Sequence, residues 1–560
     1  MLDVIARSQR GRICKYKREK QLVSTPYIMK VSMTKCDEPI YIQICDRKRK
    51  LYIMGREIDL DTDIMIPESS NIVEPVKTFD FVTVLRIPYA DDVVIPEETE
   101  VLVISNAYEL RKDARKLVKT IIDIRSRAGY NVLICMLGIA DPSSIPMLSY
   151  MGIDIFDDSV VRVSGTNKIL SIPEGNIVYD ENMKERNLTI LANENSKIHD
   201  FIKAGRLREL VDQRAAASSY LVSALRLFDA EGYAYQEEAC STVGCRFACN
   251  TTQSLRRPEV LRYRKMILER YLKPKNKRIL LLLPCSAKKP YHISKTHKLL
   301  MSAIYSVAHH DLIHEVIVTS PLGAVPRELD VLFPPKSYDI PVTGEWKCEE
   351  KSFIRKLVSH IANQGYDYVV SHLGKDTELI DGICDIRETA IIDPISPTSL
   401  SKLRETLEEI IGDIKAKSDY CADTKESIRS ILSFQFGRSV ADSIMDENTT
   451  GVGKFPHWKI MRNGVQLGML SEERGMISLT ISGAQILAKN NTHIVEMENF
   501  VLKGDLLAAG VIKSDPEIRI GDETVVMSNG IVRAVGVAAM SGKEMMSLKR
   551  GIAVKIRHRS

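Results

Sequence analysis

The 560-residue chain lacks several features that mark special classes of protein. Its 78 Lys and Arg residues are nearly balanced by 73 Asp and Glu residues, so the net charge is only +5. No apolar run approaches the ~18 residues of a membrane span, and the segment Met1–Lys20 holds no signal-peptide-like apolar run. These absences argue against a polycation, a membrane protein and a secreted protein, and we expect a cytoplasmic location.

A disulfide framework is also missing, although the chain has 11 cysteines. Unevenly spread cysteines in a chain of this length are typical of free thiols in a reducing compartment. Cys240, Cys245 and Cys249 follow the spacing C-x4-C-x3-C, which is not a standard zinc or iron–sulfur pattern. We expect no metal and no other cofactor, with a metal at these three cysteines as the open alternative.

The composition that is present, 44% hydrophobic and 27% charged residues, is that of an ordinary globular protein. Apolar runs and helical patterns divide the chain into four expected domains, with ranges 1–235, 236–420, 421–492 and 493–560. We therefore predict an α/β multidomain protein. With so small a net charge, a nucleic-acid partner would be held by a local basic patch.

In the first domain, strand-like runs at Val101–Ile104 and Val132–Met136 alternate with amphipathic helices at Leu110–Arg127 and Leu207–Leu227. This alternation favours a mainly parallel sheet covered by helices. The segment Val163–Glu194, which carries Gly, Pro, Asn and Glu, is interpreted as a loop region.

The second domain repeats the alternation in a compact form. Three apolar strands are predicted at Ile279–Leu283, Glu315–Thr319 and Tyr366–Ser371, with helices between and after them. Strands this apolar are buried on both faces of their sheet, which predicts a three-layer α/β core domain.

The last two domains have a different pattern. A helical stretch at Thr424–Met445 opens a small α+β domain, and short β runs with turns every ~8–12 residues follow from Phe455. A Ser-Asn-Gly turn between Thr524–Met527 and Ile531–Val537 predicts a hairpin. We expect the C-terminal module to be a small β-barrel.

One segment concentrates reactive side chains. Pro284–His297 follows a buried strand and precedes a helix, and ligands of open α/β sheets bind at the carboxyl ends of the strands. Nearby cations and a helix start lower the pKa of a thiol, which would make Cys285 a nucleophile. The cations are Lys288, Lys289, His292, Lys295 and His297. His297 could act as a general acid or base, and Tyr291 and Ser294 offer hydroxyls. A small buried cysteine beside a solvated or phosphate-binding loop is the alternative.

Two later segments are predicted to frame the same cleft. The candidate substrate-binding residues there are Ser320, Arg327, Glu328, Asp339 and Thr343. Arg327 can pair with a carboxylate or phosphate, and Glu328 with an amine. Trp346, close behind Thr343, is either a stacking wall for a base or a hydrophobic anchor of its loop.

The pattern PC-x3-KPY-x2-S-x2-H matches positions 284 to 297 at every fixed residue, and on it the chain resembles the archaeosine synthases over essentially its whole length. The matching residues are Pro284, Cys285, Lys289, Pro290, Tyr291, Ser294 and His297. We take Pro284 and Pro290 as substrate-binding and the other five as catalytic. The resemblance implies a substrate, 7-cyano-7-deazaguanine at position 15 of archaeal tRNA, and an amine donor, with lysine favoured over glutamine.

The first domain resembles a tRNA-guanine transglycosylase in the segments Ile145–Leu148, Gly152–Asp157 and Gly205–Val211. This resemblance implies a degenerate (β/α) barrel and, by analogy, a homodimer. No DSGGF-like segment supplies the transglycosylase nucleophile, and Asp157–Ile202 contains none of that family's zinc cysteines. We therefore expect a domain that does not exchange bases.

The C-terminal segment from Phe500 resembles a PUA domain, a small β module that binds structured RNA. The matching segments are Phe500–Asp505, Ala509–Val511, Asp515–Glu523, Ala534–Gly536 and Met540–Glu544. The candidate RNA-binding residues are Lys503, Lys543, Arg550 and Arg557. Basic side chains of this kind can bind the phosphates of tRNA.

The mechanism that we expect begins with attack of the Cys285 thiolate on the nitrile carbon to give a covalent thioimidate. Tyr291 or His297 would protonate the nitrogen, and the donor amine, held by Arg327 and Glu328, would displace the thiol. The resemblance also implies a radical SAM partner enzyme that opens a lysine adduct. The alternatives are direct attack of the amine on the nitrile, an active transglycosylase, and a non-catalytic tRNA-binding scaffold.

Overall fold

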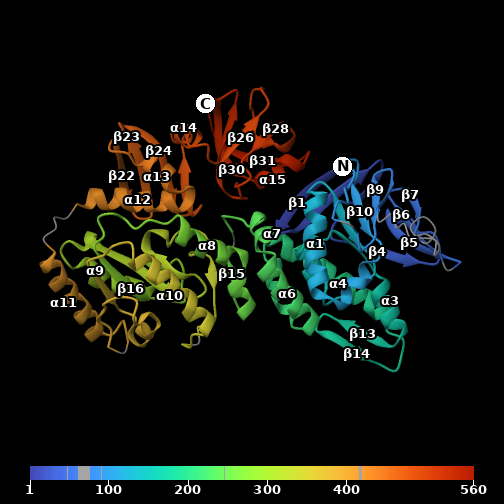
Figure 1. Ribbon diagram of the computed structural model, residues 1–560, viewed down its shortest axis with the longest axis horizontal. Coiled ribbons are helices and arrows are strands. Elements are labelled where there is room, and N and C mark those ends of the chain that lie inside the picture. Colours follow the sequence, from blue (N-terminus) through green and yellow to red (C-terminus); the bar gives the residue numbers. More distant parts are fainter. Residues whose placement is uncertain are drawn as a thin grey trace. The chain divides into compact units, whose positions relative to one another are not determined.

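The computed structural model describes residues 1–46, 48–60, 76–89, 91–244, 246–342, 344–391, 393–414 and 419–560. They divide into two compact units. Unit 1 consists of Met1–Cys240, Leu507–Ala509 and Lys543–Ile552, and unit 2 of Ser241–Leu506, Gly510–Gly542 and Ala553–Ser560. Helices and strands alternate in both units, which confirms a mixed α/β multidomain protein (Figure 1). The finer division into four domains stays a prediction.

A nine-stranded mixed sheet with the order β7-β6-β5-β4-β12-β11-β10-β9-β8 is the centre of unit 1. The strands from β5 to β9 in this order run parallel, as predicted. The predicted runs become β10 (Val101–Ile104) and β11 (Leu133–Met136). The other strands are β4 (Tyr27–Ser32), β5 (Ile40–Cys45), β6 (Lys48–Ile53), β7 (Arg56–Asp59), β8 (Val76–Phe79), β9 (Val82–Leu85) and β12 (Ile155–Asp157). Among the described residues β7 and β8 are the two edges, and a closed barrel stays a prediction.

Both faces of this sheet are buried. Along β10, Leu102 and Ile104 belong to a core that includes residues of α1 (Ala114–Ala128) and α6 (Ser219–Glu231). Val101 and Val103 point to the opposite core, which includes residues of a separate sheet. That sheet is formed by β1 (Leu2–Ser8), β2 (Gly11–Arg18) and β3 (Gln21–Ser24). Successive side chains of β10 point to opposite faces of the sheet, and apolar residues are buried on both faces.

The interpretation of Val163–Glu194 as a loop region is wrong. It contains the end of α3 (Ser159–Thr166), a hairpin of β13 (Ile169–Ile172) and β14 (Gly175–Val178), and the first half of α4 (Lys184–Lys203). The buried Asn187 ties them together, since its side chain bonds the backbone of Val161, Ile169 and Ser171 at 2.9–3.1 Å. A polar side chain holds these elements, so apolar periodicity does not reveal them.

The predicted helix at Leu207–Leu227 is also two helices, α5 (Leu207–Ala215) and α6. The break occurs where the Ser218 side chain accepts a hydrogen bond from the Leu221 N–H and caps α6. Unit 1 also contains α2 (Ile145–Tyr150) and α7 (Tyr233–Glu238). No helix in the described part of the chain is long and apolar enough to cross a membrane.

A five-stranded sheet with the order β18-β17-β16-β20-β21 lies at the centre of the predicted core domain, within unit 2. The predicted strands become β16 (Ile279–Pro284), β17 (Ile313–Thr319) and β20 (Tyr368–Ser371), and β16 pairs in parallel with both of the others. The edges are β18 (Gly323–Pro326), antiparallel to β17, and β21 (Arg387–Glu388). The carboxyl ends of the three central strands therefore meet at one edge of the sheet.

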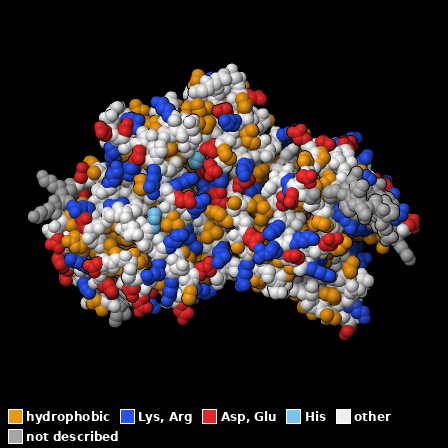
Figure 2. Space-filling view, viewed as in Figure 1, with side chains coloured by type: hydrophobic (Ala, Val, Ile, Leu, Met, Phe, Trp, Pro, Cys, Tyr) orange, Lys and Arg blue, Asp and Glu red, His pale blue; other side chains and the backbone are white. Residues whose placement is uncertain are grey.

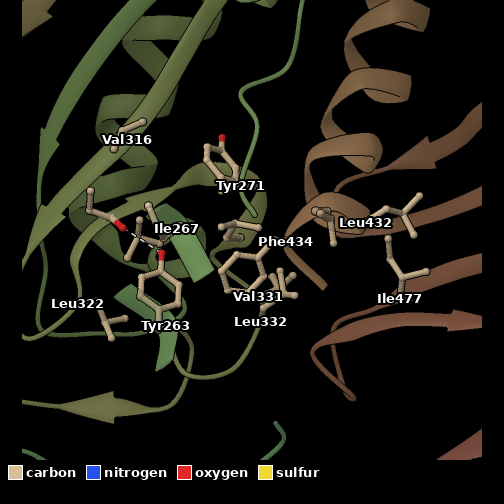
Figure 3. Packing of buried hydrophobic residues seen from close by; sticks show 14 of the residues in the cluster. Tyr263, Ile267, Tyr271, Val316, Leu322, Val331, Leu332, Leu432, Phe434 and Ile477 are labelled. Atoms are coloured by element: carbon tan, nitrogen blue, oxygen red, sulfur yellow. Dashed lines mark hydrogen bonds between the residues drawn. The ribbon is translucent and has the colours of Figure 1, made fainter. Parts of the chain in front are cut away.

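Helices cover both faces of this sheet, as the apolar strands predicted. Leu280 and Leu282 of β16 face a core with α8 (Pro258–Glu269) and α10 (Cys348–Ala362). Leu281 and Leu283 face the other core, with α9 (Lys295–Tyr305) and α11 (Pro397–Asp413). In Figure 3, Tyr263, Ile267 and Leu322 lie together in the first of these cores, and Leu432, Phe434 and Ile477 extend it toward the following elements.

The following elements form two smaller sheets. Helices α12 (Tyr420–Phe436) and α13 (Arg438–Ile444) replace the single predicted helical stretch. The first sheet has β22 (Thr449–Lys454), β23 (His457–Arg462), β24 (Val465–Ser471) and β25 (Met476–Leu479), followed by α14 (Ile481–Lys489). The second has β26 (Ile494–Met497), β27 (Leu506–Leu507), β28 (Val511–Ser514), β29 (Glu523–Ser528), β30 (Ile531–Ala538) and β31 (Ile552–Arg559). Three short elements lie outside these two sheets: helix α15 (Gly542–Ser547) and the paired strands β15 (Phe247–Ala248) and β19 (Tyr338–Asp339).

The predicted C-terminal hairpin is confirmed. Strands β29 and β30 are antiparallel, and their turn residues Asn529 and Gly530 have φ values of 51° and 74°. A two-residue hairpin turn of the primed type requires positive φ at both positions, and Asn-Gly is the pair that adopts it most readily.

Substituting the central strand of unit 2 should destabilise that unit selectively. Leu282→Ala leaves a cavity in the core and should cost about 2–5 kcal/mol. The two tryptophans, Trp346 and Trp458, both lie in unit 2, so their fluorescence in urea reports this unit. The matched control is Leu102→Ala, a fully buried leucine in unit 1, which should leave the fluorescence midpoint unchanged. If the fluorescence midpoint fell equally in both variants, the two units would not unfold separately.

Candidate active site

Cys285 lies at the carboxyl edge of the sheet in unit 2. Strand β16 ends at Pro284, which pairs with Val318 of β17, and the half-buried Cys285 follows directly. Thr319 ends β17 one residue after Val318, and β20 leads into a turn of 3₁₀ helix, η6 (Gly374–Ile380). The structure thus places the cysteine where three parallel strands converge, as in other open α/β sheets with ligands.

The expectation that the surroundings lower the pKa of Cys285 is wrong. Burial raises the pKa of this thiol, and Asp376 raises it further, while Lys289, the Thr319 hydroxyl and a backbone hydrogen bond act in the opposite direction. The physical reason is that most of the predicted cations are directed elsewhere. Lys288 and Lys295 are exposed, and His292 is bound to Asp330.

Lys289 is the cation that acts on the cysteine. Its pKa is lowered by burial, while Cys285 and Asp339 raise it. Its Nζ lies 4.2 Å from the ring centroid of Tyr338, over the face of the ring. Because burial disfavours its charge and Cys285 acts on it, Lys289 is the group best placed to exchange a proton with the thiol.

Asp330 fixes the conformation of the motif, although the sequence analysis did not select it. Its buried carboxylate accepts hydrogen bonds from the backbone N–H groups of Tyr291 (2.6 Å) and His292 (2.8 Å) and lies 2.9 Å from His292 Nδ1. Burial would raise the pKa of Asp330, but these bonds and the charge of Arg327 hold it below its usual value. The signal in the sequence was weak, since Asp330 follows Arg327 by three residues outside any recognisable motif.

Ser294 and His297 begin helix α9. The Ser294 hydroxyl accepts a hydrogen bond of 3.1 Å from the His297 backbone N–H, as an N-cap does. The His297 side chain is fully buried, and its Nδ1 accepts a hydrogen bond of 2.9 Å from Arg327. Burial, followed by the charge of Arg327, lowers the pKa of His297 to about 3. The imidazole is therefore neutral at pH 7.

Arg327 and Glu328 are committed to partners within the fold. Arg327 donates two hydrogen bonds, of 2.7 and 2.9 Å, to Glu315 on β17. The buried Glu328 accepts a hydrogen bond of 2.5 Å from the Tyr271 hydroxyl and lies 3.4 Å from His314 Nε2. Both side chains are therefore already paired within the protein, although we expected Arg327 to bind the carboxylate of the donor and Glu328 its amine.

The other predicted substrate contacts lie around the same edge. Ser320 is buried, and its hydroxyl has no hydrogen-bond partner among the described residues. Asp339 pairs with Arg246 at 2.8 Å. Pro290 is half-buried beside Tyr291, and Thr343 lies outside the described residues.

Trp346 and Asp376 form an additional polar contact near the cysteine. The indole Nε1 of Trp346 donates a hydrogen bond of 3.0 Å to the Asp376 carboxylate. Asp376 lies in η6, at the carboxyl end of β20, and its charge reaches Cys285. Sequence reasoning missed Asp376, because only the fold brings it to this edge.

Three buried hydroxyls lie near Cys285, and two of them were also missed. The Tyr291 hydroxyl donates to Thr319 Oγ1 at 3.2 Å, and the Tyr338 hydroxyl is 2.6 Å from the same atom. The hydroxyls of Tyr291 and Tyr338 also bond each other directly. Each side chain is at most 1% exposed, so their hydrogen bonds are made within the protein. The Thr319 hydroxyl also lies within hydrogen-bond distance of the Ser320 carbonyl, at 3.0 Å.

The ten described cysteines form no disulfide. Cys240 and Cys249 are buried, whereas Cys245 lies outside the described residues. Within the described ranges no group of three or more His, Cys, Asp or Glu side chains could hold a metal ion.

The four candidate RNA-binding cations have different surroundings. Lys503 and Arg550 are exposed, and the exposed Lys543 pairs with Glu238 at 2.6 Å. Arg557 is bound to the buried Glu523 and to the Leu479 carbonyl, which commits it to the fold. Figure 2 shows Lys and Arg interspersed with Asp and Glu over the face in view, consistent with a net charge of only +5.

Two family profiles match parts of the chain. One is described as a domain of unknown function, DUF5591, and covers residues 260–407, which include the whole Cys285 motif. The other is the PUA domain, which covers residues 495–559 and confirms the predicted C-terminal module.

Three known proteins are similar over large parts of the chain. Archaeosine synthase subunit alpha of Thermoplasma acidophilum is 34% identical over 467 residues, covering 83% of this chain and 89% of that protein. A tRNA-guanine(15) transglycosylase of Methanobrevibacter smithii is 24% identical over 476 residues, covering 75% of this chain and 66% of that protein. The crystal structure of AF0587, a protein of unknown function, is 28% identical and covers 53% of this chain and 99% of that one, with a TM-score of 0.42.

The buried, neutral His297 predicts a pH dependence of stability. Its pKa of about 3 in the folded protein compares with 6.5 ordinarily, so the unfolded chain binds a proton first as the pH falls. The stability that it contributes is complete above about pH 6.5 and is lost as the pH falls toward 3. Between about pH 7.5 and 5, the wild type should lose about 2 kcal/mol more than His297→Asn, which keeps an acceptor for Arg327 but does not titrate.

The measurement is the urea midpoint of tryptophan fluorescence at a series of pH values. Equal losses in the wild type and in His297→Asn would mean that His297 titrates in the folded protein as it does in the unfolded chain.

Proposed function

The chain belongs to the archaeosine synthase subunit alpha family, and on this basis we propose that it adds an amine donor to the nitrile of 7-cyano-7-deazaguanine at position 15 of tRNA. Its family makes it a tRNA-modifying enzyme of archaeosine biosynthesis. The observation that carries the chemical proposal is the half-buried Cys285 at the carboxyl end of β16, with Lys289 beside it.

In the first step the sulfur of Cys285 attacks the nitrile carbon. Lys289, whose pKa is lowered by burial, takes the thiol proton as a neutral amine. A C–S bond forms, one C–N π bond breaks, and the nitrile nitrogen receives the proton. The product is a thioimidate with all atoms of thiol and nitrile retained, which divides a difficult addition into two easier steps.

In the second step the donor amine attacks the thioimidate carbon. The C–S bond breaks, the amine loses one proton, and the sulfur leaves as a thiolate that regains a proton through Lys289. The net reaction joins nitrile and amine into an amidine and regenerates the enzyme. Lysine is the favoured donor, with glutamine as the other candidate.

The contacts of the motif suggest a revised division of roles. Ser294, His297 and Arg327 shape the loop, because Ser294 caps α9, Arg327 bonds His297 Nδ1, and Glu315 accepts from Arg327. The unpartnered hydroxyl of Ser320 remains available to the substrate. We assign the binding of the donor's ammonium group to Asp376, a carboxylate whose charge already reaches the sulfur.

The remaining parts of the chain would serve the tRNA and the partners. The PUA domain would hold the tRNA through exposed cations such as Lys503 and Arg550. Unit 1 would be a degenerate transglycosylase-type barrel that does not exchange bases and that mediates a homodimer. The subunit designation in the name of the Thermoplasma relative supports a further partner, which we propose to be a radical SAM enzyme.

Replacing Cys285 should abolish product formation. tRNA carrying the nitrile base is incubated with the protein and lysine or glutamine, and its nucleosides are analysed by mass spectrometry. The wild type should add the mass of lysine, whereas Cys285→Ala should lose activity by about 10³-fold or more, because the covalent step is gone. The matched control is Cys348→Ala, an exposed cysteine of unit 2, which should remain active.

The same assay separates the alternatives. Substantial activity of Cys285→Ala would mean that the amine attacks the nitrile directly. A gain of ammonia's mass with glutamine would name the other donor. No product with either donor, together with exchange of labelled guanine into tRNA, would favour an active transglycosylase, and neither activity would favour a tRNA-binding scaffold.

Charge reversal in the PUA domain should weaken tRNA binding in a salt-dependent manner. Lys503→Glu should lower the affinity for tRNA and reduce the slope of log K against log salt by about 1, the share of one phosphate contact. Filter binding over a range of salt concentrations measures both quantities. Lys119→Glu, an exposed lysine on α1, is the control, and an equal effect there would point to nonspecific charge repulsion.

A further inference from the structure

The hydroxyls of Tyr291, Thr319 and Tyr338, here called the hydroxyl triangle, have a limited number of protons. The three hydroxyls contact each other along three edges, and each hydroxyl can donate one hydrogen bond. When every edge is used, all three protons are consumed within the triangle. Cys285 and Thr319 directly follow Pro284 and Val318, which pair across β16 and β17, so the two side chains leave neighbouring strand ends. A bond from Thr319 to the Cys285 sulfur requires the Thr319 hydroxyl to turn away from Tyr338 and from the Ser320 carbonyl.

The two arrangements suit different states of the cysteine. With a neutral thiol, the triangle can stay closed. With a thiolate, Tyr338 donates to Tyr291, Tyr291 to Thr319, and Thr319 to the sulfur, so that three bonds point toward one negative charge. Aligned hydrogen bonds in a buried site polarise one another and favour the charged acceptor.

We propose that Thr319 and Tyr338 are positioning residues of the archaeosine synthase reaction, which with Tyr291 form a hydrogen-bond chain that stabilises the Cys285 thiolate as it attacks. Neither residue lies in the PC-x3-KPY-x2-S-x2-H motif. The proposal deepens the proposed function, and its chemical part rests on that function. In this proposal the buried Tyr291 hydroxyl acts on the sulfur through Thr319 and does not contact the substrate.

Other charged groups also act on this sulfur. Lys289, from the loop after β16, favours the thiolate, and Asp376, from η6, opposes it. Neither is part of the triangle, so substitutions at Thr319 and Tyr338 leave both charges in place. A change in the titration of Cys285 in those variants can thus be attributed to the hydroxyls.

The test measures alkylation of Cys285 by iodoacetamide as a function of pH, because only the thiolate reacts. Other cysteines are exposed, so mass spectrometry follows the tryptic peptide Ile279–Lys288, in which Cys285 is the sole cysteine. Thr319→Val keeps the branched shape but loses the hydroxyl, and it should lower the rate at neutral pH about tenfold or more, since a hydrogen bond to a charged group is lost.

Three further variants serve as comparisons and as a control. Tyr338→Phe should lower the rate less, because it removes the far end of the chain, and Thr319→Ser should restore the wild-type profile. Tyr263→Phe is the matched control, since its buried hydroxyl bonds the Ala324 carbonyl and belongs to no edge of the triangle. If folded Thr319→Val gives the wild-type pH profile, the proposal is overturned.

The nucleoside assay then tests the role of the hydroxyls in the nitrile reaction separately from their effect on the thiolate. Alkylation needs neither tRNA nor donor, so its outcome holds even if the proposed nitrile reaction fails in the wild type. If the wild type is active, Thr319→Val should lower kcat with KM nearly unchanged. Loss of binding without loss of kcat would assign Thr319 to substrate contact instead.

Discussion

A single buried carboxylate, that of Asp330, holds the Cys285 motif in its conformation. It accepts hydrogen bonds from two backbone N–H groups and contacts the His292 ring, and these contacts fix the conformation of the loop between β16 and α9. Without it those buried donors would be left unpaired, at a cost of about 1–3 kcal/mol each. The place of Tyr291 in the hydroxyl triangle, and hence the surroundings of the sulfur, depends on this anchor.

The sequence predicted the elements that local patterns determine. Strand β16 and its parallel neighbours were found because strands buried on both faces are continuous apolar runs, and the β29–β30 hairpin was found because Asn529 and Gly530 favour its turn. The location of Cys285 at the carboxyl edge followed from the same reasoning. The PUA domain was found through its resemblance to that family and is confirmed by the family profile.

What escaped prediction depends on tertiary contacts. Thr319, Asp330, Tyr338 and Asp376 come from separate elements and approach the motif only in the folded sheet. The sign of the pKa shift at Cys285 was missed because counting nearby cations in the sequence ignores burial of the thiol and the Asp330 carboxylate that binds His292. The α4 helix was missed because a polar residue, Asn187, ties it to the fold.

The raised pKa of Cys285 also bears on how the enzyme survives oxidants. Peroxides react with thiolates, and a cysteine that rests as a thiol is a slow target for conversion to sulfenic and then irreversible sulfinic acid. Cys45, Cys348 and Cys421, by contrast, are exposed to solvent. In the proposed reaction Cys285 is charged only during turnover, and this would keep the nucleophile reduced between encounters with tRNA.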